Sequence, residues 1–299
     1  MQNETPPEFR REMYVSPAPY LPFLDAHKGK PPGLWALDPA TWVELDAAYA
    51  PQMAYRDRLN GERADQVALA TPGSEAAVAE LSDHLVDYLT KDPSTGFLRI
   101  GEGVRRPDGV TIIATGAIGA LGRLCQEDWV VMQERDGASE YVLTAANLCF
   151  PSHWDLREKI GLPLTPIHAP VPDYEVDLAP RINRVFSALH EDRPLQRLNW
   201  SVYDYDELHL PGAPHRATGR DARPDFFLRV ERQTLRRLPQ TKAVVFGIKI
   251  YITPLEDLPK DVLGPLAEAL LAQPRSLVEY KGGEALLSGS VDRINELRA

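Results

Sequence analysis

The chain has 299 residues, of which 43% are hydrophobic and 25% are charged. These proportions exclude a disordered or collagen-like chain, and this length allows one large core or two smaller ones. Acidic residues outnumber basic residues by 43 to 33, which gives a formal net charge of −10. A negative chain repels phosphate backbones and anionic lipids, so we expect no nucleic-acid partner and no membrane partner.

The cysteine content bears on the compartment and on metal sites. The two cysteines, Cys125 and Cys149, lie in apolar surroundings without a CxxC spacing. Two thiols are too few for a four-cysteine zinc or iron–sulfur site, and isolated thiols are typical of a reducing compartment. The polar N-terminal sequence lacks a signal-peptide core, and no run of about 18 apolar residues occurs. We therefore expect a cytoplasmic protein.

Proline-rich segments separate helical patterns in the first third of the chain. Residues 1–34 are rich in proline, which predicts an extended arm lying on the body of the protein. A helix is predicted over residues 38–60, bent or broken at Pro51. A clearer helix is predicted over residues 74–91, because apolar residues recur there every three or four positions after Ser74, the expected N-cap.

From Val110 onward, short β-branched or apolar runs alternate with turn residues, which predicts strands. The predicted strands cover residues 110–115, 128–134, 140–150, 198–204, 226–235 and 243–252. Asp136-Gly137 predicts a hairpin turn between the second and third of them. Further helices are predicted over residues 152–160, where Ser152 and Asp155 form a capping box, and over residues 177–190 and 256–299.

This order of elements predicts an α+β fold. The central portion, about residues 110–255, has the order β-β-α-α-β-β-β, which is typical of a PAS-like domain, a small antiparallel sheet that holds a ligand against its helices. Helical segments flank this core on both sides. We predict an extended N-terminal arm at residues 1–34 and a single domain at residues 35–299.

Three common catalytic motifs are missing from the sequence. The glycine-rich stretch 115–122 lacks the GxGxxG spacing of a dinucleotide loop and is better explained as a turn region. No histidine pair has the HExxH spacing of a zinc site, and no GxSxG serine-hydrolase motif occurs. Three loop histidines, His27, His209 and His215, are expected to be exposed.

Two other histidines flank a predicted short helix, His153 before it and His168 after it. His168 lies between Pro166 and Pro170, whose rings stiffen the backbone and largely preset the direction of the side chain. Such a position suits a neutral imidazole that ligates iron with little ordering cost. A histidine packed by prolines and bonded to the backbone is the equally good alternative.

The predicted strand 226–235 carries more charge than a central strand usually does. Alternation places Arg229 and Glu231 on one face, with Phe227 and Gln233, and Arg232 on the other face. A buried carboxylate beside a ligand suits an amine cation, and a buried guanidinium suits an acid group. A solvated outer face explains the same pattern equally well.

Several ordered segments, spread over most of residues 20–290, carry a family resemblance. They are Gln126-Glu127-Asp128, LCFPSHWDLREKIG, IHAPVP, Leu198-Asn199-Trp200, RVERQTLRRLP and the strand ending Tyr251-Ile252-Thr253-Pro254-Leu255. In these segments the chain resembles the heme-dependent oxidative N-demethylase alpha-subunit-like family. The resemblance implies a PAS-like domain that holds heme b.

The activity implied by the resemblance is a monooxygenase-type oxidative N-demethylation. Dioxygen would oxidise an N-methyl group of a small secondary amine such as dimethylamine, giving the demethylated amine and formaldehyde. Electrons from NADPH would arrive through flavin and iron–sulfur carriers on partner subunits, since two cysteines cannot hold such a cluster. A noncatalytic heme-binding PAS-like sensor, or a gas-binding protein, is the alternative, because a fold alone does not specify a function.

The resemblance also assigns expected roles to residues. His168 is the expected axial ligand of the iron, with His153 as the alternative. The expected partners of the heme propionates are the arginines that can form bidentate contacts with carboxylates, namely Arg232, Arg236 and Arg237.

The substrate would be held by residues of neighbouring strands. Glu231 is expected to bind the alkylammonium against an aromatic wall made by Trp200 or Tyr251. Arg229 would polarise dioxygen or fix Glu231, and Asn199 is grouped with the substrate-binding residues.

Overall fold

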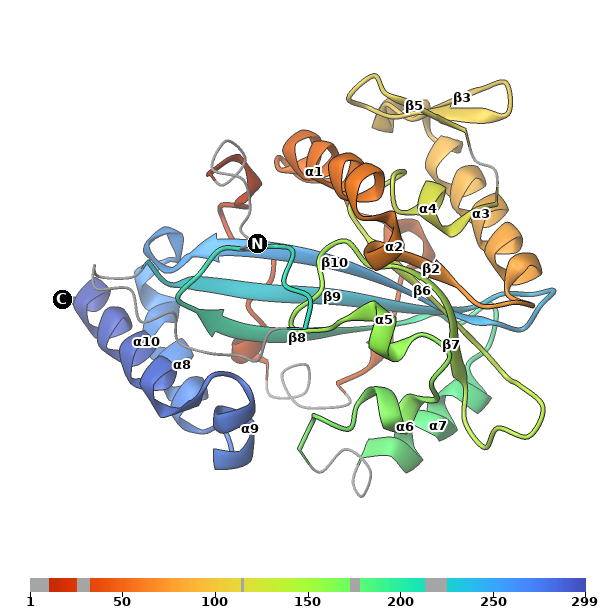
Figure 1. Cartoon of the computed structure of the whole chain (residues 1–299). Coiled ribbons are helices and arrows are strands. Elements are labelled where there is room, and N and C mark those ends of the chain that lie inside the picture. The colour runs from red at the N-terminus through yellow and green to blue at the C-terminus, as the bar shows by residue number, and fades with distance from the viewer. Residues whose placement is uncertain (1–10, 26–32, 114–115, 173–177, 213–224) are drawn as a thin grey trace.

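The computed structural model describes residues 11–25, 33–113, 116–172, 178–212 and 225–299. In this part of the chain a seven-stranded antiparallel sheet is surrounded by helices (Figure 1), which confirms the α+β class. The order of its strands is β1-β8-β9-β10-β6-β7-β2. Their bounds are Trp35–Ala36 (β1), Ala68–Ala70 (β2), Asp128–Gln133 (β6), Val142–Asn147 (β7), Leu195–Tyr203 (β8), Phe227–Arg237 (β9) and Val244–Pro254 (β10).

The helices occur before, within and after the run of long strands. In chain order they are Tyr49–Glu62 (α1), Ala64–Val67 (α2), Glu75–Thr90 (α3), Ile118–Leu121 (α4), Leu156–Lys159 (α5), Leu164–Ile167 (α6), Ala179–Ala188 (α7), Lys260–Leu271 (α8), Arg275–Tyr280 (α9) and Gly283–Arg298 (α10). Among the described segments, no helix has both the length and the apolar character needed to cross a membrane.

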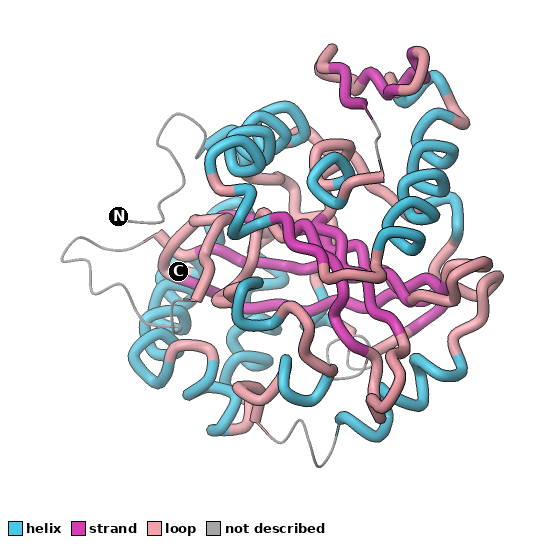
Figure 2. Tube along the Cα trace, turned by 45° about the vertical axis from the view of Figure 1, so that its right-hand side comes forward, coloured by secondary structure: helices cyan, strands magenta, loops and turns pink. Residues whose placement is uncertain are grey.

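The predicted strand 110–115 does not join the main sheet. Its described part, Thr111–Ile113 (β5), pairs with Gly103–Arg105 (β4), which pairs with Leu98–Ile100 (β3). This small sheet lies beyond α3, apart from the long strands (Figures 1 and 2). The expectation that this strand opens the central core was therefore wrong. Val104 and Ile112 bury their side chains in an apolar cluster that also contains α3 and main-sheet residues such as Trp129, so the small sheet shares a core with the main sheet without pairing to it.

The first helix begins later than predicted, at Tyr49. The predicted helix 38–60 is replaced by a 3-10 turn at Pro39–Thr41 and by α1, in whose first turn Pro51 lies. A proline there does not bend the helix, because its missing N–H has no intrahelical partner to lose. Ser74 occupies the N-cap position of α3, but its hydroxyl donates to the carbonyl of Thr71 instead of capping the helix.

The predicted helix 152–160 is reduced to the single turn of α5. Ser152 does not cap it and instead forms an isolated bridge with Leu210. Asp155 is the N-cap, and its Oδ1 accepts the backbone N–H of Arg157 at 2.9 Å. We expect Asp155→Ala to lower the free energy of unfolding by about 1 kcal/mol in urea titrations. Glu158→Ala in the same turn is the control, and an equal loss in both variants would contradict a capping role.

The proline-rich N-terminal arm is packed on the sheet where it is described. Met13 and Val15 are buried. The backbone N–H of Val15 donates to the carbonyl of Ile252, and the hydroxyl of Thr253 donates to the carbonyl of Val15. These bonds follow the half of β10 that β6 leaves unpaired, so the arm covers an exposed strand edge.

The two faces of the main sheet have different coverings. Residues paired directly across antiparallel strands share a face, so Trp200, Val230 and Tyr251 lie on one face. They belong to the apolar cluster that includes α8 and α10, and we call this the α8–α10 face. Leu235 and Phe246 lie on the opposite face and pack against α6 and α7, and we call this the α5–α7 face.

Candidate functional site

Polar side chains converge on the α5–α7 face of β8 and β9. The register places six of them there, namely Arg197, Asn199, Ser201, Arg229, Glu231 and Gln233. The half-buried carboxylate of Glu231 accepts two amide N–H groups at Oε2, from Asn199 at 3.2 Å and from Gln233 at 3.0 Å. These bonds orient the carboxylate within this group of polar side chains. The structure thus brings together Glu231 and Asn199, which are both predicted site residues.

Arg229 is buried on the same face, two residues from Glu231 along β9. Its guanidinium donates to the carbonyl of Phe150 at 2.9 Å and to that of Glu207 at 3.2 Å. These bonds tie the segments after β7 and β8 to the centre of the sheet. Its Nε has no hydrogen-bond partner among the described residues. Arg229 therefore has a fixed position and one buried donor left for a ligand.

His168 ends helix α6, with its ring centroid 5.9 Å from that of Trp154. Its Nδ1 lies 2.9 Å from the carbonyl oxygen of Leu164. A carbonyl only accepts, so Nδ1 carries the proton and Nε2 carries the lone pair. Burial is the main reason why the pKa of His168 is lowered to about 4; the bond to Leu164 opposes this effect, and the cation Arg197 adds to it. The result is a neutral imidazole with the N–H-to-carbonyl bond typical of metal-ligating histidines.

His153 has a different environment. Its φ angle of 61° places it in the left-handed region, which is strained for a residue with a side chain. Its Nε2 lies 2.7 Å from the hydroxyl of Tyr205, whose ring stacks on that of Tyr203 at 4.7 Å. Ligation of a metal through Nε2 would require this hydrogen bond to break.

His209 was expected to be an exposed loop histidine, and that expectation was wrong. Its exposed fraction is 1%. Its Nδ1 donates to the carbonyl of Cys149 at 2.7 Å, and burial lowers its pKa to about 4. The Nε2 atom has no hydrogen-bond partner within the described segments. The only signal of this burial in the sequence was the apolar pair Leu208 and Leu210 on either side of His209. The other two histidines of this prediction, His27 and His215, lie outside the described residues.

The three arginines predicted to bind propionates have other partners. Arg232 lies on the α8–α10 face, because it is one residue from Glu231 in a strand, and it forms an ion pair with Glu44 at 3.2 Å. Arg236 places its guanidinium 4.3 Å from the ring centroid of Trp42. Arg237 donates to four oxygens, those of Tyr141, Phe186, Leu189 and Lys242. The structure does not bring all three of these arginines together at one site.

Trp200 and Tyr251 are also separated from Glu231 by the sheet. Both lie on the α8–α10 face, where Tyr251 donates its hydroxyl to Glu44. They do not form the aromatic wall expected beside Glu231, because alternation puts them on the opposite face. Burial raises the pKa of Tyr203 and of Tyr280, and the charge of Glu231 acts on both in the same direction.

Lys281, which directly follows α9, is a residue that the sequence analysis missed. Its Nζ donates to the carbonyl of Trp200 at 2.7 Å and lies 5.5 Å from the ring centroid of that residue. Burial lowers the pKa of Lys281 from 10.5 to about 8, while the charge of Glu231 opposes this shift and Arg197 adds to it. The segment after α9 therefore places a cation against β8, where the charge of Glu231 acts on it.

The lowered pKa of Lys281 has a measurable consequence for stability. Between about pH 8 and pH 10.5 the unfolded chain holds a proton that the folded chain has released. The free energy of unfolding of the wild type, relative to Lys281→Met, should therefore rise across this interval by on the order of 1 kcal/mol. Urea titrations at several pH values measure it, with Lys260→Met at an exposed lysine as the control. A difference independent of pH would contradict the shift.

The chemistry of this donor set fits a heme. Among the described residues, no group of three or more His, Cys, Asp and Glu side chains could hold a bare metal ion. A single neutral histidine such as His168 suits an iron whose other ligands come from a porphyrin. Two cations in its neighbourhood, Arg197 and Lys159, suit propionate groups.

A comparison with protein families agrees with this chemistry. The chain matches the family model described as Haem-dependent oxidative N-demethylase, alpha subunit-like, over residues 33–288. The match includes every strand of the main sheet and the helices α1 to α9, and it ends within α10, at residue 288. The description denotes a heme-dependent oxidoreductase that works with another subunit. The resemblance seen in the sequence is thus confirmed, and the chain belongs to the Haem-dependent oxidative N-demethylase, alpha subunit-like, family.

Proposed function

We propose that this chain is a heme b monooxygenase that demethylates a small secondary amine of the dimethylamine class. One amine, one dioxygen, two electrons and two protons would give the demethylated amine, formaldehyde and water. The electrons would come from NADPH through flavin and iron–sulfur carriers on a partner reductase. The observation that carries the proposal is the neutral, carbonyl-bonded His168 near a sheet face that carries the amide-held carboxylate of Glu231.

We assign the heme to a PAS-like core made of β6 to β10 with α5 to α7. In this unit the first strand, β6, lies centrally between β7 and β10, which supports the assignment. His168 would hold the iron through Nε2, since Nδ1 is bonded to Leu164. When bound, the heme supplies dioxygen activation, which no side chain provides. The compartment is the cytoplasm, a proposal supported by the two buried free thiols.

Glu231 is the residue that would bind the substrate amine. A small secondary amine is a cation at neutral pH, and the carboxylate of Glu231 offers charge and hydrogen-bond acceptors. Asn199 and Gln233 donate to one oxygen, Oε2, so they fix the carboxylate without neutralising it. The nearby cation Lys281 would repel the bound ammonium, so its deprotonation near pH 8 favours binding. Arg229 would offer its Nε–H to a polar atom in the same pocket.

The proposal is tested by visible spectra of the heme-reconstituted chain. We expect a stoichiometric Soret band that shifts when dimethylamine is added and does not shift with dimethyl ether, its uncharged isostere. With a matching reductase, formaldehyde and methylamine should form in equal amounts. A Soret band that responds to gases but to no amine would favour the sensor. Failure to retain heme would contradict the function altogether.

A further inference from the structure

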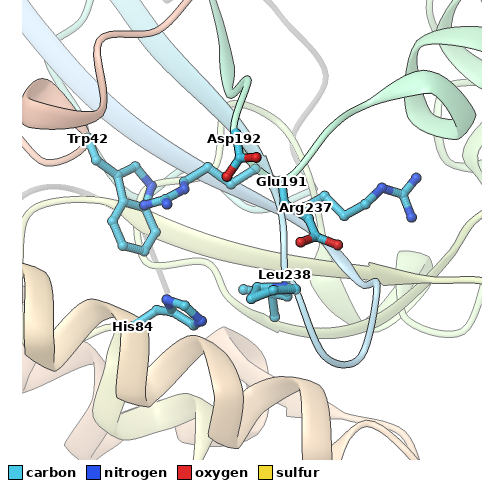
Figure 3. A pocket seen from close by; sticks show the side chains of 8 residues that line it. Trp42, His84, Glu191, Asp192, Arg237 and Leu238 are labelled. Carbon is cyan, nitrogen blue, oxygen red and sulfur yellow. The ribbon is translucent and has the colours of Figure 1, made fainter.

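A small cavity lies away from the Glu231 carboxylate, between α3, the turn after β9 and the segment after α7. Its volume is about 160 Å³. Its lining consists of Trp42, His84, Glu191, Asp192, Arg236, Arg237, Leu238 and Pro239 (Figure 3). This volume is below the roughly 300 Å³ at which pockets for drug-sized ligands begin. The cavity is therefore suited to a ligand of a few atoms and not to heme.

Arg236 contributes a cation to this cavity without a compensating charge. Its guanidinium is held 4.3 Å from the ring centroid of Trp42. In the described part of the chain no carboxylate forms an ion pair with it. Burial lowers the pKa of Arg236, and only the hydroxyl of Tyr88 opposes this effect. A partly desolvated cation without a counter-charge is unfavourable, so an anionic ligand would stabilise it.

The two acidic residues in the lining do not neutralise Arg236. Glu191 forms an ion pair with Lys242. Asp192 is 89% exposed at its side chain, and its Oδ2 lies 3.6 Å from Nδ1 of His190. Glu191 is therefore paired with Lys242, and the carboxylate of Asp192 is solvated, so neither forms an ion pair with Arg236.

Among the residues that line the cavity, Arg236 is the main charged hydrogen-bond donor. The side chain of Arg237 points away from Trp42 and His84 in Figure 3, because it binds carbonyl and hydroxyl oxygens elsewhere. His84 is partly exposed, and the indole N–H of Trp42 has no hydrogen-bond partner among the described residues. Donors thus outnumber uncommitted acceptors around the cavity.

We propose that this cavity binds a small monocarboxylate of the acetate or formate type through Arg236. A guanidinium stacked on an aromatic ring keeps its in-plane N–H groups for a planar carboxylate. The fork geometry of the guanidinium matches two carboxylate oxygens. A phosphate dianion is disfavoured, because the carboxylates of Glu191 and Asp192 stand at the rim.

The test is a titration of the full chain with sodium acetate at constant ionic strength, with sodium chloride as the replaced salt. The readout is the Nε–H signal of Arg236 in ¹⁵N NMR spectra of arginine side chains. We expect a saturable shift below about 200 mM acetate, a range that includes the weak affinities of ligands with few atoms. Arg236→Lys should weaken binding at least about tenfold, as followed at the ring signals of His84, because lysine lacks the fork.

The matched control is Arg105→Lys, the same change at an exposed arginine of β4, which should leave the acetate affinity unchanged. A shift of equal size with chloride, or no saturation, would overturn the proposal. Tighter binding of inorganic phosphate than of acetate would overturn the choice of a carboxylate. Should Arg236→Lys fail to fold, the wild-type titrations with acetate, chloride and phosphate decide the matter alone.

Discussion

Replacing His168 by alanine is expected to lower the retention of heme at least about tenfold, because the axial ligand is the one bond between protein and iron in the proposed site. The burial that keeps this imidazole neutral also means that no proton has to leave before the iron binds. The measurement is the heme content per chain after reconstitution and gel filtration, followed by the Soret band of the retained fraction.

Two histidine variants make this experiment discriminating. His153→Ala should retain heme, because its Nε2 is bonded to Tyr205. His209→Gln is the stricter comparison, since His209 shares with His168 the neutral state and the Nδ1 bond to a carbonyl. Loss of heme from either of these variants, with full retention in His168→Ala, would show that His168 is not the axial ligand. Thermal unfolding of each heme-free variant shows whether a loss reflects misfolding.

Glu231→Gln is expected to weaken dimethylamine binding by about tenfold or more while leaving the heme spectrum unchanged. A hydrogen bond to a charged partner contributes roughly 1.5–3 kcal/mol, and glutamine removes the charge while conserving the shape. The amides of Asn199 and Gln233 can still donate to the new side-chain oxygen, so the local structure should persist. The measurement is the amine concentration that gives half of the Soret shift.

The control for this variant is Glu102→Gln, at an exposed glutamate between β3 and β4, which should leave the titration unchanged. Lys281→Met gives a second, independent check of the same carboxylate. It removes a competing cation near Glu231, so dimethylamine binding below about pH 8 should become tighter. An unchanged titration in Glu231→Gln would exclude this carboxylate from the amine site.

Much of the local structure was predictable because it depends on periodicity within single segments. The apolar repeat after Ser74 predicted α3, and the β-branched runs predicted the strands that became β6 to β10. The alternation along β9 correctly placed Arg229 with Glu231 and Arg232 on the other face. The stiff setting of His168 between prolines was also visible, and the structure adds its bond to Leu164.

The grouping of residues into sites was beyond the sequence, because it depends on strand register and on contacts between distant segments. Trp200 and Tyr251 belong to motifs that neighbour Glu231 along the strands, yet each side chain is directed to the opposite face of the sheet. His209 is buried by segments more than fifty residues away, and Lys281 reaches the sheet from the C-terminal helices.

The sequence by itself determined the fold class, the main elements, the family and the alternation of charge along β9, because all of these are properties of local order along the chain. Only the tertiary structure decided which charges are neutralised. It joined Arg232 to Glu44 across 188 positions of the chain and left Arg236 in a cavity without a carboxylate partner among the described residues. Pairing of charges is a matter of distance in space, which the separation of residues in sequence does not specify.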